Sequence, residues 1–128
     1  MKLLLPFFLL FLCACTTTSI TPEISKQLSD PLICEGEKQC KEMWDRAMYF
    51  INTNAAFKIQ TVNDNMIETY NPRQGSRKLA FRVLKQPLGN NKYKILTFAW
   101  CDDTMFGCQP DKWIAIVRAK QYIRTGVE

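Results

Sequence analysis

The first fifteen residues constrain the fold more than any other part of the sequence. Met1 and Lys2 are followed by thirteen residues without a charged side chain, from Leu3 to Cys15. A helix needs about 20 apolar residues to cross a bilayer, whereas a run of about 10 to 14 is typical of the apolar part of a secretory signal peptide. The sequence therefore predicts an exported protein whose folded domain is built from the residues that follow.

The end of this apolar run, Leu12-Cys13-Ala14-Cys15, resembles the lipobox of bacterial lipoproteins. Leu12 occupies the aliphatic position, Ala14 the small residue before the cleavage site, and Cys15 the cysteine that becomes the lipidated N-terminus. The resemblance implies a diacylglycerol on Cys15, and two or three acyl chains would make dissociation from the bilayer negligible. The alternative is an ordinary secretory signal that leaves Cys15 free or in a disulfide; both alternatives export the protein.

The residue after Cys15 indicates which membrane carries the anchor. Inner-membrane lipoproteins of enteric bacteria typically have Asp at this position, whereas this chain has Thr16. The resemblance therefore implies a lipid anchor in the outer membrane, with the domain facing the periplasm.

The chain divides into three parts: a signal peptide over residues 1–14, a lipidated N-terminus with a flexible stalk over 15–30, and one small disulfide-bonded domain over 31–128. We predict the stalk because the segment TTTSITPEISKQLSD is rich in hydroxyl groups and has little apolar periodicity. The remaining length of the chain suffices for one compact domain, and covalent cross-links would help so small a core.

Four cysteines are left for such cross-links once Cys13 is removed and Cys15 is lipidated: Cys34, Cys40, Cys101 and Cys108. An even number of cysteines in an exported chain predicts disulfides. Pairing Cys34 with Cys40 and Cys101 with Cys108 is favoured because short loops close most easily, and the crossed pairings remain open. The spacings are atypical of zinc ligands and the chain has no histidine, so we expect no metal or cofactor.

Apolar periodicity predicts two helices in the domain. From Gly36 to about Asn54, apolar residues recur every three or four positions, as in an amphipathic helix. Pro110 and Asp111 open a second helix, and Gly126 ends it.

Between the two predicted helices, two-residue alternation indicates four strands. They lie near residues 57–61, 66–70, 79–84 and 92–100, with Pro87 ending the third. Both faces of the last strand are apolar, which predicts a central or doubly covered position. We therefore expect an α+β fold: helix, four-stranded antiparallel sheet, helix, with both helices on one face of the sheet.

The sequence gives little sign of catalysis. Without histidine, the usual serine and cysteine triads are excluded. Ser76 stands beside Arg77 and Lys78 in a segment that has the composition of a turn, and the adjacent residues Asp102 and Asp103 would point apart on an extended chain. We therefore expect a protein that is not an enzyme; a hydrolase with atypical catalytic groups is a further alternative that no motif supports.

The strongest candidate for partner binding is the loop CDDTMFGC, in which a disulfide would hold Asp102, Asp103, Met105 and Phe106 on a short tip. The alternative is that Phe106 folds back under the second helix. A weaker candidate is formed by basic residues, since residues 55–128 carry twelve basic and six acidic side chains. These basic candidates are Arg77, Lys78, Arg82, Lys85 and Lys94.

We expect an outer-membrane lipoprotein that binds another envelope component, a protein, as an assembly, secretion or structural accessory. The alternative is a periplasmic inhibitor or immunity-type factor that acts through the Cys101 to Cys108 loop. Nucleic acid is not an expected partner, and the sequence does not reveal the oligomeric state.

Overall fold

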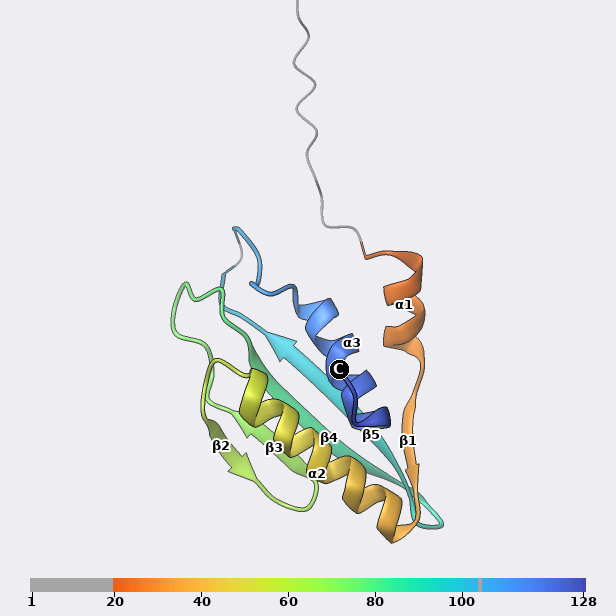
Figure 1. Ribbon diagram of the computed structural model, residues 1–128. Coiled ribbons are helices and arrows are strands. Elements are labelled where there is room, and N and C mark those ends of the chain that lie inside the picture. Colours follow the sequence, from red (N-terminus) through yellow and green to blue (C-terminus); the bar gives the residue numbers. More distant parts are fainter. Residues whose placement is uncertain (1–19, 104) are drawn as a thin grey trace, which may run out of the picture.

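The computed structural model describes residues 20–103 and 105–128, so the predictions on the signal peptide and on Cys15 lie outside it. It is an α+β domain with three helices and a five-stranded antiparallel sheet in the order β1-β5-β4-β3-β2 (Figure 1). The elements are α1 (Pro22–Ser29), β1 (Leu32–Glu35), α2 (Gly36–Asn54), β2 (Ile59–Val62), β3 (Met66–Thr69), β4 (Ala80–Gly89), β5 (Lys92–Trp100) and α3 (Lys112–Thr125). The fold class agrees with the prediction, but the four-stranded sheet and the simple helix, sheet, helix order were wrong.

The fifth strand is β1, which forms one edge of the sheet. It pairs with β5, from Leu32 opposite Ile95 to Glu35 opposite Lys92. Leu32 and Cys34 are buried and the residues between and after them are exposed. Four residues contain only two alternations, too few for the sequence to distinguish this strand from a loop.

The additional helix, α1, lies within the predicted stalk. Thr21 caps it, because its hydroxyl accepts a hydrogen bond from the N–H of Ile24 at 3.3 Å. At its other end, the Lys120 ammonium donates to the carbonyls of Gln27 at 2.6 Å, Leu28 at 3.0 Å and Asp30. Residues 22–29 are therefore a helix docked on α3, and the prediction of a flexible segment there was wrong.

The long helix α2 has the predicted bounds, Gly36–Asn54. Its buried side chains form one stripe: Cys40, Met43, Ala47, Phe50 and Ile51. A disulfide between Cys34 and Cys40 joins its N-terminal part to β1. Its other contact of note is to α3, where the Arg46 guanidinium donates to the carbonyls of Ile123 at 3.2 Å and Arg124 at 3.1 Å.

The strand β4 continues through Pro87, which was expected to end it. Its neighbour β3 pairs with β4 only from Arg82 to Leu84, so at Pro87 the single remaining partner is β5. A proline can occupy a strand that is an edge on one side, because no backbone N–H is needed there. The strand then turns into β5 through Asn90 and Asn91, both with positive φ, as a tight hairpin requires.

The helices α2 and α3 cover the same face of the sheet (Figure 1). The strand residues beneath them are fully buried, among them Ile67, Phe81, Val83 and Ile95. The opposite face also carries apolar side chains, but no described helix packs on it, and Phe98 is 45% exposed there. The strand β5 therefore lies between two neighbours, as predicted, with one of its two apolar faces open.

Candidate functional site

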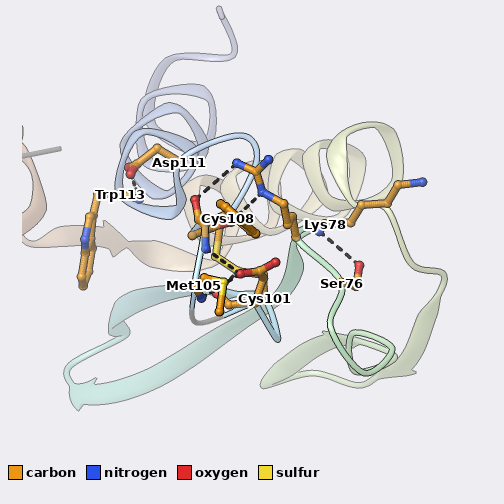
Figure 2. The surroundings of a disulfide bond; sticks show 11 residues. Ser76, Lys78, Cys101, Met105, Cys108, Asp111 and Trp113 are labelled. Atoms are coloured by element: carbon orange, nitrogen blue, oxygen red, sulfur yellow. Dashed lines mark hydrogen bonds between the residues drawn. A yellow bond between two sulfur atoms is a disulfide. The ribbon is translucent and has the colours of Figure 1, made fainter. Parts of the chain in front are cut away.

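The loop between β5 and α3 is closed by a disulfide from Cys101 to Cys108, whose Cα atoms are 5.6 Å apart. Together with the Cys34 to Cys40 bond, this is the pairing that the short loops favour. Both cysteines of the loop are partly buried and pack against the core. Figure 2 shows the disulfide beside Asp111, which caps α3 by accepting hydrogen bonds from the N–H groups of Trp113 and Ile114.

The two predicted aspartates of this loop bind backbone groups. The Asp102 carboxylate accepts a hydrogen bond from the N–H of Gly75 at 2.8 Å. The Asp103 carboxylate accepts from the N–H groups of Met105 at 2.9 Å and Phe106 at 2.8 Å. A carboxylate that satisfies backbone donors in a turn shapes the turn. These two residues therefore position the tip and are poor candidates for an acid and base pair.

Arg77 fastens the loop from the other side. Its guanidinium donates to the carbonyls of Gly107 at 3.0 Å and Phe106 at 3.3 Å, and its own carbonyl accepts from the N–H of Gln109 at 2.8 Å. Gly107 has a φ of 74°, a conformation that residues with a side chain adopt at a cost. Arg77, a candidate for partner binding, thus also stabilises the loop, and its contact with a partner stays a prediction.

Met105 and Phe106 project from the loop into solvent. Met105 is 83% exposed and Phe106 is 71% exposed, the highest values for large apolar side chains among the residues that the structure describes. The alternative in which Phe106 folds back under α3 was therefore wrong. We refer to these two side chains as the apolar tip.

The remaining basic candidates do not gather at the apolar tip. Arg82 lies on the open face of the sheet, where it forms an ion pair with Glu68. Its guanidinium carbon also lies over the ring of Trp100, 5.7 Å from the ring centroid. Lys85 lies on the helix side, over the ring of Trp44 at 5.0 Å. The side chain of Lys78 points away from the loop (Figure 2). Arg82 and Lys85 therefore lie on opposite faces of the sheet, and a role of these basic residues in partner binding stays a prediction.

Two apolar features were missed from the sequence. The open sheet face carries Leu96, Phe98 and Trp100 beside one another on alternate positions of β5. A hollow of about 280 Å³ lies between α1, β5 and α3, lined by Leu28, Trp113 and neighbouring residues. The two-sided apolar pattern of β5 was the signal for the first feature, but sequence alone could not say which face would be covered.

The electrostatic feature of most interest lies away from the loop, at Lys120. Burial lowers the pKa of its ammonium, and the neighbouring charge of Arg124 lowers the pKa further, while Asp30 acts in the opposite direction. The ammonium donates hydrogen bonds to three backbone carbonyls at the end of α1. Lys120 therefore serves the docking of α1.

Neither a metal centre nor a membrane span occurs in the part of the chain that the structure describes. Within residues 20–103 and 105–128, no three His, Cys, Asp or Glu side chains come together in a way that could hold a metal ion. Among the described helices, none combines the length and apolarity that crossing a bilayer requires.

Comparison with known proteins gives no relative. The chain matches no protein-family model, no curated protein and no solved structure. What the protein does must therefore be argued from its own residues.

Proposed function

We propose that the protein is an outer-membrane lipoprotein, anchored through Cys15, whose periplasmic domain binds another component of the cell envelope and catalyses no reaction. The observation that carries the binding role is the apolar tip, which a disulfide, Asp103 and Arg77 together present to solvent. Exposed apolar side chains on a preordered loop favour docking, because little conformational entropy is lost on binding.

The chemistry of the tip supports binding over catalysis. Met105 and Phe106 offer no proton donor, nucleophile or metal ligand. The carboxylates next to them accept hydrogen bonds from backbone N–H groups. The contribution of such a tip is apolar surface, which stabilises a complex roughly in proportion to the area removed from water. A role in assembly, secretion or structure of the envelope fits this chemistry.

The anchor would make even a weak contact effective. Confinement of two components to one membrane raises their effective concentration into a range where a modest affinity is sufficient. The mass of the mature protein tests the anchor directly. We expect a chain that begins at Cys15 and carries the mass of two or three acyl chains, and a chain that retains Met1 without added lipid would refute the proposal.

A photo-crosslinking amino acid placed at position 106 in cells tests the binding role. We expect adducts with an envelope component from position 106 and none from position 49, where the tyrosine is also exposed but lies on α2. Adducts with a soluble periplasmic enzyme or toxin would instead support an inhibitor or immunity-type factor. Equal and weak labelling at both positions would refute binding through the tip.

A further inference from the structure

The apolar tip and the point where the chain enters the domain lie at the same end of the molecule. Figure 1 shows the start of α1, the start of α3 and the loop before α3 at one end, opposite the turn between β4 and β5. The contacts agree with this view, because Arg124 at the end of α3 binds Asp30 at the end of α1, at 3.0 Å. The two helices therefore run side by side in the same direction, away from the end that carries the tip.

The covalent chain between the anchor and this end is short. Four residues lie between Cys15 and Ile20, the first residue that the structure describes, so the two are five residue steps apart. Even when fully extended, five residues span at most about 17 Å. A protein lipidated at Cys15 must therefore keep the start of α1 near the bilayer surface, and the loop at the same end is near that surface as well.

The groups at this end suit a lipid surface. Met105 and Phe106 are apolar and largely exposed, and Ile114, in the first turn of α3, is 45% exposed. The carboxylates of Asp102 and Asp103, which would be unfavourable near anionic headgroups, accept backbone hydrogen bonds. Lys112 opens α3 beside the loop, and a lysine near an anionic membrane is attracted to it.

We propose that the apolar tip inserts into the headgroup region of the same membrane that holds Cys15, so that the domain has a second, non-covalent contact with the bilayer. This inference rests on the anchor proposed above and names the component that the tip meets. Two apolar side chains bind a membrane weakly by themselves, but the anchor holds them at high effective concentration next to it. The second contact fixes the orientation of the domain.

Hydroxyl-radical footprinting of the lipidated full-length protein tests the inference. The protein is reconstituted in vesicles of phosphatidylethanolamine with a minor share of phosphatidylglycerol, and vesicle flotation confirms anchoring. The reference is an unanchored form, secreted with an ordinary signal peptide and starting at Thr16. We expect oxidation of Met105 to fall by about fivefold on vesicles, because methionine oxidation follows exposure. Oxidation of Tyr49, on α2, should not change.

Two variants sharpen the result. Phe106→Ser should raise the oxidation of Met105 on vesicles toward that of the unanchored form. The control Val62→Ser, at an exposed apolar residue on β2, should leave the protection intact. Both changes are at the surface, so both variants should fold with two disulfides.

The outcomes separate the two proposals. Vesicle flotation combined with full oxidation of Met105 would overturn membrane docking and leave the lipoprotein proposal standing. Protection of Met105 that requires native envelopes and is absent with pure lipid would also overturn it, in favour of a protein partner. Failure to float, with no acyl mass on Cys15, would refute the anchor itself.

Discussion

Lys120 offers the most direct test of how the domain is held together near its N-terminus. The side chain is 8% exposed and its ammonium donates to three carbonyls, those of Gln27, Leu28 and Asp30. Replacement by methionine keeps most of the aliphatic stem and removes the charge and all three hydrogen bonds. The carbonyls at the end of α1 then lose the group that satisfies them.

The expected loss of stability follows from these contacts. A hydrogen bond to a charged group contributes about 1.5 to 3 kcal/mol. Two effects offset part of the loss: water can reach the end of α1, and the unfavourable burial of the ammonium is relieved. We therefore expect Lys120→Met to lower the free energy of unfolding by about 2 kcal/mol, close to the value of one such bond. For a domain of about 100 residues this corresponds to a fall in Tm of about 10 °C.

The measurement is urea denaturation of both proteins, together with hydrogen exchange of the amides in α1. The amides of residues 22–29 should lose protection in the variant, since their helix is docked through Lys120. Lys41→Met is the matched control, because Lys41 pairs with Asp45 at the surface of α2, and it should leave both measurements unchanged. An unchanged denaturation midpoint with α1 still protected in Lys120→Met would refute this account of α1.

Three further predictions concern pH and the loop. In the folded protein the pKa of Lys120 is lowered below 10.5. Between the lowered pKa and 10.5 the unfolded chain therefore binds more protons than the folded one, so the free energy of unfolding should rise as the pH increases through this range. Denaturation of the wild type and of Lys120→Met across this range should show that dependence only in the wild type. Replacing Cys101 and Cys108 by alanine removes the disulfide that closes a loop with a sequence separation of 7. The free energy of unfolding, measured by urea denaturation, should fall by about 2.4 kcal/mol. Gly107→Ala should cost about 1 kcal/mol from backbone strain alone, because φ is positive and the added methyl meets no neighbour; an unchanged Tm would contradict this.

The elements that the sequence predicted well are those whose burial follows a long pattern. The buried stripe of α2 runs from Cys40 to Ile51, about three turns, and the predicted bounds of the helix agree with the structure. The strand β5 was likewise indicated by its alternation, and its predicted bounds, residues 92–100, agree with the structure. In both elements, the apolar residues that repeat at the spacing of the helix or strand include those that the fold buries.

The features that were missed depend on residues distant in the sequence. The helix α1 has no buried side chain, and its docking depends on Lys120, which lies about ninety positions further along the chain. Pro87 has no backbone N–H to donate, and it is tolerated because β3 does not extend far enough to pair with it. The direction of Phe106 depends on Arg77 and Asp103, whose contacts no spacing rule indicates. The candidate residues of the loop could be named from the sequence, but their separate roles could not.

The docking of α1 on α3 also determines how far into the periplasm an anchored domain could extend. A chain of about 100 residues folds to a radius of gyration of about 13 Å, so a domain of this size is about 30 Å across. With a five-residue tether of at most about 17 Å, its far end stays within about 50 Å of the bilayer. If α1 detached and unfolded, residues 21–30 would lengthen the tether by about 35 Å. The contacts of Lys120 and Arg124 with the end of α1 would therefore keep the tether of an anchored domain at about a third of the length that a detached α1 would allow.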